Sequence, residues 1–318
     1  MRETEYAYAV ARIRVNELSL LTKADLDQLI SADSYSAAVR ILTGKGWQEV
    51  AGGDMCEEKL NEAWELICES VPDKKLLEAM VIGNDFMNVK SVIKTTFSDL
   101  KSEDYIVRPF VCDPAKIIKA VKENDFEELP DYIKECASKA YHAISGNQSG
   151  QSAEMIIDKA SLETSLDYAK SAGSELLVKI IGLACLVANI KIAVRSSRTG
   201  KTEQFALDSM CKCDFTDNKK LTDAAFKGES LADIVSEAGY PEIADEVDKD
   251  FTALEMKCDN LVTEWIKKAK DEVYGPDPII AYYYAKQAEI KNVRIILSAK
   301  AAGVPTDTIR ERVRDLYV

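Results

Sequence analysis

Gly200, Lys201 and Thr202 form the stretch of this chain that most resembles a nucleotide-binding motif. In a phosphate loop, backbone amides of a glycine-rich turn and a lysine side chain hold the phosphates. That motif needs another glycine five residues before the second one, directly after a strand. Arg195 occupies the earlier position, and the residues before it have the pattern of a helix. We therefore expect no nucleotide site here.

Two cysteines separated by one residue, Cys211 and Cys213, could offer thiolates to a metal ion. A closed zinc site needs four ligands at characteristic spacings. The only histidine, His142, and the nearest further thiol in the later sequence, Cys258, are both far away along the chain. The expected role of the pair is that of ordinary thiols in a loop.

Other groups that could carry catalysis are sparse. One histidine limits general acid–base chemistry, although carboxylates can replace it. No serine or cysteine lies in a nucleophile elbow, and the acidic pairs at 57–58 and 127–128 have the character of solvated helix faces. The sequence therefore predicts no catalytic residue, no cofactor and no metal.

Three regularly spaced stretches repeat one pattern, in which an asparagine, an aliphatic residue and a cation follow one another: Asn88-Val-Lys90, Asn189-Ile-Lys191 and Asn292-Val-Arg294. In each, apolar residues stand two before the asparagine, one after it, and four and five after it. That spacing marks one face of an α-helix. A long fixed period indicates one structural unit used three times, and such repeats tend to build a surface, ring or funnel.

The recurring asparagine is the most informative side chain of this repeat. Asparagine is a mediocre helix former because its amide competes for backbone hydrogen bonds. Its presence at one register in all three stretches indicates a buried amide that ties the helix to a neighbouring turn; direct contact with a partner is the alternative. The cation two residues later would then point elsewhere, toward the next module or a partner.

The remaining sequence predicts an all-α fold, because alanine, leucine, glutamate and lysine dominate and alternating β-branched runs are absent. Glycine and proline mark the helix boundaries. The clearest are a helix over 35–42 ended by glycines, a break at 71–73, a helix start at Asp113-Pro114, a polar loop at 145–150, and breaks at 275–278 and 303–306. Adding the repeat, we expect three helical modules, residues 1–103, 104–208 and 209–318.

Bulk properties exclude several classes of protein. The net charge of −13 over 318 residues argues against nucleic-acid binding, which requires phosphate neutralisation. From Lys286 onward seven cations outnumber four anions, a pattern typical of a solvated helix face.

Eight cysteines without paired spacing, and a charged opening of the chain, favour reduced thiols in the cytosol and no signal peptide. The apolar run 176–194 is free of charge only over 180–190, too short for a membrane span.

Residues 6–14, the three asparagine-containing helices, and the ending 288–297 with 309–318 together resemble the C subunit of the archaeal and bacterial A/V-type rotary ATPases, whose eukaryotic vacuolar counterpart is the d subunit. The resemblance covers the whole chain. Its most specific part is the segment 288–318. The middle module departs most from the pattern, with Ala188 before its asparagine and the polar stretch 145–150.

The resemblance implies an all-helical protein of three modules around a pseudo-threefold axis, forming a funnel. It implies a place between the central-stalk subunits D and F and the membrane-embedded rotor ring, whose cytoplasmic loops it would contact. Such a protein transmits torque without catalysis of its own, in a machine that couples ATP hydrolysis or synthesis to proton or sodium transport. It would be cytoplasmic and peripheral to the membrane, with no span of its own.

Two other classes of function are compatible with the residues alone. One is a stand-alone helical-repeat scaffold that binds other soluble proteins. The other is an enzyme that uses carboxylates or the Cys211/Cys213 pair.

Overall fold

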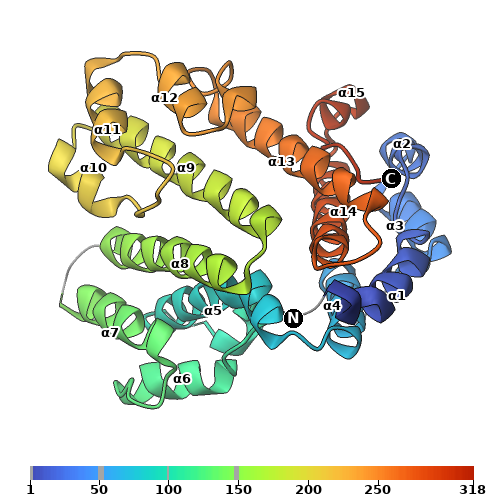
Figure 1. Cartoon of the computed structure of the whole chain (residues 1–318), viewed down its shortest axis with the longest axis horizontal. Coiled ribbons are helices and arrows are strands. Elements are labelled where there is room, and N and C mark those ends of the chain that lie inside the picture. Colours follow the sequence, from blue (N-terminus) through green and yellow to red (C-terminus); the bar gives the residue numbers. More distant parts are fainter. Residues whose placement is uncertain (1–2, 49–53, 99, 147–149) are drawn as a thin grey trace. The chain divides into compact units, whose positions relative to one another are not determined.

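Helices make up the regular secondary structure of this protein. The computed structural model describes residues 3–48, 54–98, 100–146 and 150–318, and no strand occurs in these ranges (Figure 1). The expected all-α class is therefore confirmed. A sequence rich in good helix formers and poor in alternating β-branched residues favours this outcome.

Contacts divide the chain into two compact units. Unit 1 combines residues 1–74 with residues 252–318, and unit 2 comprises residues 75–251. This division follows packing, whereas the three expected modules follow similarity between successive elements. The two divisions therefore describe different properties of the chain.

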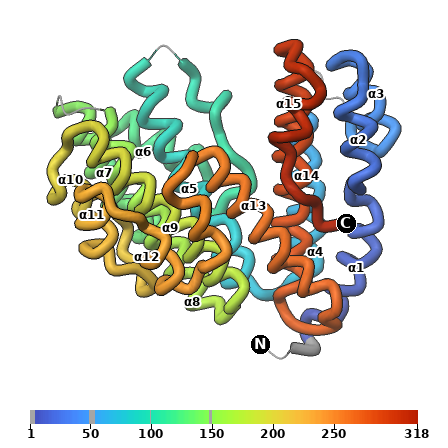
Figure 2. The backbone as a smooth tube through the Cα atoms, turned by 90° about the horizontal axis from the view of Figure 1, so that it is seen from above, coloured from blue at the N-terminus to red at the C-terminus, as the bar shows by residue number. Residues whose placement is uncertain are grey.

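Unit 1 is built around its longest helix, α14 (Asp277–Ala301). Helices from the beginning of the chain, among them α1 and α4, lie beside α14 (Figure 2). The remaining elements of this unit are η1 (Glu3–Tyr6), α1 (Ala7–Glu17), α2 (Lys23–Ser31), α3 (Tyr35–Gly44), α4 (Met55–Ser70), α13 (Phe251–Lys268), η4 (Ala269–Asp271) and α15 (Thr306–Arg310). Unit 1 thus joins segments from opposite ends of the sequence in one core.

Unit 2 contains the other two asparagine-containing helices, α5 (Lys74–Thr96) and α9 (Glu175–Arg198). Helix α8 packs lengthwise against α9 (Figure 1). The remaining elements are η2 (Ser102–Tyr105), α6 (Pro114–Glu123), α7 (Asp131–Ser145), α8 (Gly150–Ala172), α10 (Glu203–Ser209), α11 (Asn218–Lys227), α12 (Ala232–Glu237) and η3 (Pro241–Ile243).

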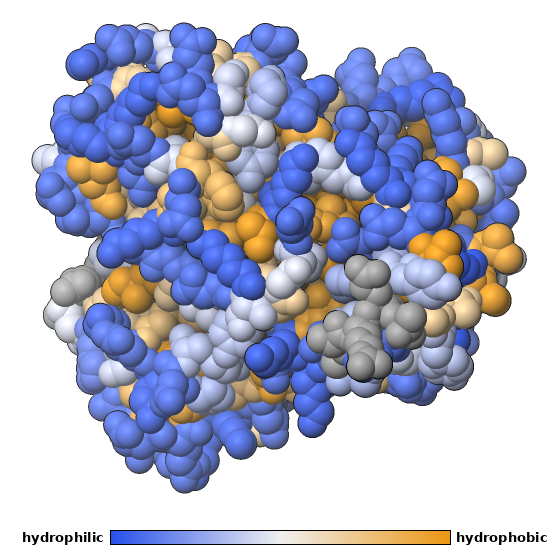
Figure 3. All heavy atoms as spheres, in the orientation of Figure 1, coloured by the Kyte–Doolittle hydropathy of each residue, from blue (hydrophilic) through white to orange (hydrophobic). Residues whose placement is uncertain are grey.

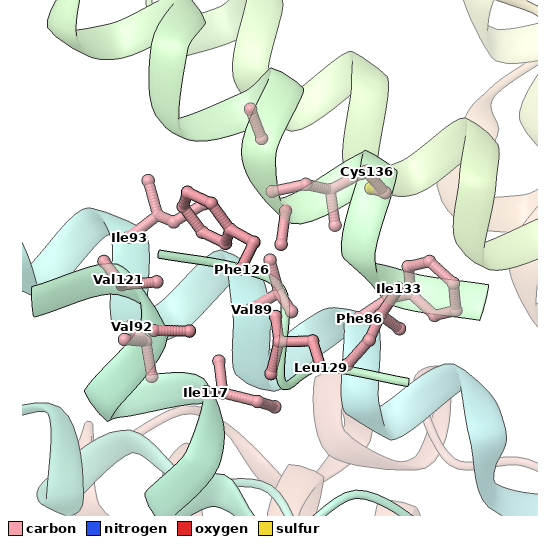
Figure 4. Packing of buried hydrophobic residues seen from close by; sticks show 14 of the residues in the cluster. Phe86, Val89, Val92, Ile93, Ile117, Val121, Phe126, Leu129, Ile133 and Cys136 are labelled. Carbon is pink, nitrogen blue, oxygen red and sulfur yellow. The ribbon is translucent and has the colours of Figure 1, made fainter. Parts of the chain in front are cut away.

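One apolar core of unit 2 forms where α5, α6 and α7 meet. Figure 4 shows side chains from the three helices converging, with Val89 of α5, Ile117 of α6 and Ile133 of α7 all fully buried. Val89 directly follows Asn88, so the apolar face predicted from the repeat is the face that α5 buries. This burial fixes the direction in which Asn88 points.

Most of the predicted helix boundaries agree with the structure. Helix α3 ends at Gly44, α4 and α5 are separated by 71–73, and Asp113 caps α6 with Pro114 at its first position. At 275–278 the prediction was partly wrong, because α14 already begins at Asp277 and Pro278 lies in its first turn. Proline is tolerated there since the first amides of a helix have no intrahelical partner. Part of the expected loop at 145–150 lies outside the described residues.

Helix α9 is, among the described residues, the one helix long and apolar enough by length and composition to cross a membrane. Within its apolar window 61% of the residues are buried inside the protein. Leu183, Leu186 and Ile190 are almost completely enclosed. The core role of α9 agrees with the sequence, whereas its length does not: the helix is longer than the charge-free run 180–190, which alone is too short for a span.

Candidate functional site

The amide of Asn88 on α5 is fully buried and bonded to the backbone of one later residue. Its Nδ2 donates to the carbonyl of Val107 at 3.1 Å, and its Oδ1 accepts from the amide N–H of Val107 at 2.7 Å. A side-chain amide has both donors and an acceptor. It can therefore pair with both polar groups of a residue in a non-helical segment, as a neighbouring strand would.

Asn189 on α9 makes the same pair of bonds with Cys211. The distances are 2.9 Å from Nδ2 to the Cys211 carbonyl and 3.0 Å from the Cys211 N–H to Oδ1. Asn218 adds a second amide, because it accepts from Asn189 and donates to the same Cys211 carbonyl. Asn189 is also fully buried.

Asn292 on α14 repeats the arrangement with Arg314. Its Nδ2 donates to the Arg314 carbonyl at 3.0 Å, and the Arg314 N–H donates to Oδ1 at 2.7 Å. Asn292 is fully buried as well. All three side chains therefore hold the backbone of a non-helical segment that follows their own helix, the kind of role expected from their register.

The partner residues lie 19, 22 and 22 positions after their asparagines. We refer to these three pairs as the asparagine clamps. Each clamp satisfies a buried side-chain amide together with a peptide group that is buried at Cys211 and partly buried at Val107 and Arg314. This matters because an unsatisfied buried polar group costs about 1–3 kcal/mol. The geometry serves to position backbone, because each buried amide uses its Nδ2 and its Oδ1 for this contact.

Helix α5 holds a second non-helical segment through Asp85, a residue that the sequence analysis did not single out. Asp85, fully buried, accepts from the amides of Val111 and Cys112 and from the Tyr132 hydroxyl at 2.5 Å. Burial raises the pKa of Asp85, against the opposing effect of these hydrogen bonds. The signal was available as a carboxylate three residues before Asn88, on the same helix face.

The cations that follow two of the asparagines reach acidic residues near or on another helix. Lys90 Nζ lies 2.9 Å from Asp158 of α8, and Arg294 Nη2 lies 2.6 Å from Asp54, the cap of α4. Lys191, the cation of the second repeat, is half-buried on α9. Lys90 and Arg294 thus each connect their helix to a helix of a different expected module.

Part of the cationic ending does not have the expected solvated character. Lys286 and Glu289 on α14 are 2% and 1% exposed and form an ion pair of 2.7 Å. Glu289 also accepts from the backbone amide of Leu21 at 2.7 Å. The interpretation as a solvated helix face is therefore wrong for Lys286, although Arg310 and Arg312 are exposed.

The three residues that resemble a phosphate loop form a helix start. Thr202 caps α10 by accepting from the Phe205 amide, and the Lys201 ammonium lies over the Phe205 ring. The element before them is the helix α9. These residues lack the strand and the glycine-rich turn that would cradle phosphate.

The thiols near the second clamp serve structural contacts. Cys211 is buried, and its Sγ donates to Asn189 Oδ1 at 3.4 Å, while Cys213 is partly exposed. The hydrogen bond with Cys211 and burial raise the pKa of the Cys185 thiol. In the parts of the chain that the structure describes, no three His, Cys, Asp or Glu side chains are grouped to hold a metal.

Comparison with known proteins gives a consistent result. The family model of the ATP synthase (C/AC39) subunit matches residues 9–312. The chain is 21% identical to the C subunit of the V-type sodium ATPase of Enterococcus hirae, with 98% of this chain and 99% of the relative covered. It is 24% identical to the C subunit of the A-type ATP synthase of Methanocaldococcus jannaschii, covering 96% and 85%.

The match extends over both units and includes all three asparagine clamps except the partner residue of the last one, Arg314. Members of this family are non-catalytic subunits of rotary ATPases, which agrees with a chain whose most regular polar feature is structural. The chain belongs to the ATP synthase (C/AC39) subunit family, the family of the C subunits of the A/V-type ATPases.

Proposed function

We propose that this chain is the central-stalk adapter of its rotary ATPase, linking the stalk subunits D and F to the membrane rotor ring. The observation that carries the proposal is the family match over residues 9–312. Because the members of this family are subunits of a complex, we do not propose the alternative of a stand-alone scaffold. The adapter would transmit torque and thereby couple ATP hydrolysis or synthesis to proton or sodium transport, from the cytoplasmic side of the membrane.

Torque transmission requires that helices and connecting segments do not slip past one another. The asparagine clamps suit this requirement, since each fixes the register of a segment to a buried helix by two directional bonds. The Lys90–Asp158 and Arg294–Asp54 pairs add links between helices. Buried hydrogen bonds specify a unique arrangement more strictly than apolar packing does.

We also propose that Asn88, Asn189 and Asn292 mark equivalent positions in three modules, 1–103, 104–208 and 209–318, related by a pseudo-threefold axis as in a funnel. Each of the three helices has 23 to 25 residues, and the preceding α-helix is α4, α8 or α13, with the short η4 between α13 and α14. This common order, together with the common clamp, supports a threefold repeat.

The charge of the chain supports a basic partner for part of its surface. The net charge is −13, and hydrophilic side chains cover most of the face in Figure 3, with apolar patches between them. An acidic socket around an apolar floor would suit a basic stalk tip. Complementary charge aids encounter and register more than final affinity.

The test is the binding of recombinant D–F stalk complex to the purified chain at increasing salt. We expect the association rate to fall from low to moderate salt while some binding persists through apolar contacts. Neutralising Arg310, Arg312 and Arg314 together should have little effect on this contact. Association that ignores salt, or binding abolished by that triple change, would contradict the assignment.

A further inference from the structure

A groove of about 930 Å³ runs along the open face of α14 in unit 1. Its apolar floor includes Leu60 of α4, Ile290 of α14 and Val304. We call it the α14 groove. Ser298, exposed in the last turns of α14, also lines it.

Four cations line the α14 groove, although the chain as a whole is strongly acidic: Lys291, Arg294, Arg312 and Arg314. Two carboxylates pair with three of them. Asp259 Oδ2 is 2.5 Å from Lys291 Nζ and 3.0 Å from Arg314 Nε, and Asp54 pairs with Arg294. Among the described residues no carboxylate pairs with Arg312, which is exposed. The groove therefore keeps a positive excess beside an apolar floor.

Helix α5 has cations at the corresponding repeat positions, and the helix that packs against them indicates which kind of surface fits the cations of the α14 groove. On α5, Lys90 and Lys94 face Asp158 and Glu154, two carboxylates one turn apart on the neighbouring helix α8. Helix α8 approaches closely because Gly83 leaves room: a Cβ there would lie 3.3 Å from Ser165 Oγ. Counting from the asparagines, the position of Lys94 on α5 corresponds to Ser298 in the α14 groove. An acidic helix therefore covers this register on α5, whereas on α14 it is open to the groove.

We propose that the α14 groove binds an acidic amphipathic helix of a partner protein. The apolar face of that helix would lie on Leu60, Ile290 and Val304, and carboxylates one turn apart would face Arg312 and Lys291. A small inorganic anion would leave the apolar floor uncovered. This partner segment is different from the basic stalk tip of the proposed function, because its charge is opposite.

The test uses the purified full-length chain and a fluorescein-labelled peptide with the sequence of residues 150–172, the acidic helix that covers Lys90. Fluorescence anisotropy should show saturable binding that weakens by about ten-fold with Arg312→Glu, the size expected for reversing one charge in a small interface. Arg310→Glu is the matched control, since Arg310 is exposed nearby but does not line the groove. A peptide with Glu154→Gln and Asp158→Asn should bind as weakly as the reversed groove binds the native peptide.

A second variant tests the groove without changing its charge, so that weaker binding cannot result from an effect of charge on folding. Ser298→Trp fills the groove without changing charge and should weaken binding comparably. Absence of saturable binding, or equal binding by the wild type and Arg312→Glu, would overturn the proposal. So would equal binding of the neutral peptide. Complete displacement of the peptide by inorganic phosphate would assign the cations to a small anion instead. None of these outcomes tests the proposed binding of the D–F stalk, which is measured in a separate experiment.

Discussion

Asn189 on α9 and Cys211, 22 residues later, exchange two hydrogen bonds of 2.9 and 3.0 Å in the core of unit 2. The amide thereby satisfies the backbone of a segment that has no secondary structure of its own. The same relationship joins Asn88 to Val107 and Asn292 to Arg314. The clamp is the feature that the repeat preserves, and its energy can be measured.

Asn189→Ala should lower the free energy of unfolding by roughly 1–3 kcal/mol, because the buried N–H of Cys211 loses its acceptor and the amide oxygen of Asn218 loses its donor, while the Cys211 carbonyl keeps its bond from Asn218. Urea unfolding followed by circular dichroism measures the loss. Arg198→Ala, at an exposed site near the end of the same helix, is the control and should change little. Equal stability of wild type and Asn189→Ala would show that the clamp contributes nothing to folding.

Gly182→Ala tests the close packing of α9. A Cβ at this position would lie 2.7 Å from Tyr240 Oη and 2.8 Å from Phe215 Cε2. We expect a loss of about 1–3 kcal/mol in unfolding free energy, the usual cost of overpacking a core. Gly44→Ala serves as the control, since nothing lies within 4 Å of its added Cβ. A Gly182→Ala protein as stable as the control would mean that the two aromatic side chains can move aside at no cost.

The buried Lys286–Glu289 pair gives a prediction that depends on both partners. Glu289→Gln leaves the Lys286 ammonium without a counter-charge and should cost about 3–5 kcal/mol. Adding Lys286→Met to that variant should recover most of the loss, because the double change buries no charge and the introduced amide oxygen can still accept from the Leu21 N–H. Thermal and urea unfolding of the wild type, of Glu289→Gln, of Lys286→Met and of the double variant gives the coupling energy. A double variant less stable than Glu289→Gln alone would refute this explanation.

From the burial of the Asp85 carboxyl group we predict that the stability of the protein depends on pH. Burial raises its folded-state pKa above the unfolded value, so its contribution to stability is fully present below the unfolded pKa and is lost as pH rises through the folded pKa. The unfolding free energy of the wild type should therefore fall relative to that of Asp85→Asn across this range. Urea titrations at a series of mildly acidic pH values measure the difference. A difference that rises with pH would mean that the carboxylate is stabilised when ionised.

Local signals predicted the helices and most of their ends. Asp113 followed by Pro114 and the glycines after α3 act within a few residues, so the sequence around them is sufficient to place a boundary. The buried face of α5 was likewise predictable from apolar spacing, which a helix converts directly into one surface.

Interactions across the chain could not be predicted in the same way. Nothing near Asn292 in the sequence indicates that Arg314 will be its partner, because that pairing depends on the path of the intervening segment. Lys286 and Glu289 also look the same in sequence whether they face water or the core. Their burial follows from the packing of α14 against the first helices of the chain, and that packing joins residues from its two ends.

The central claim is that one molecule of this chain joins the stalk to the ring, and the most direct measurement is sedimentation of the three components together. Purified chain, D–F stalk complex and detergent-solubilised rotor ring are mixed in pairs and all together. We expect a ternary species only when the chain is present, because the proposed adapter binds the stalk and the ring through separate surfaces. A stalk that associates equally well with the ring without the chain, or a chain that releases the stalk on binding the ring, would contradict it.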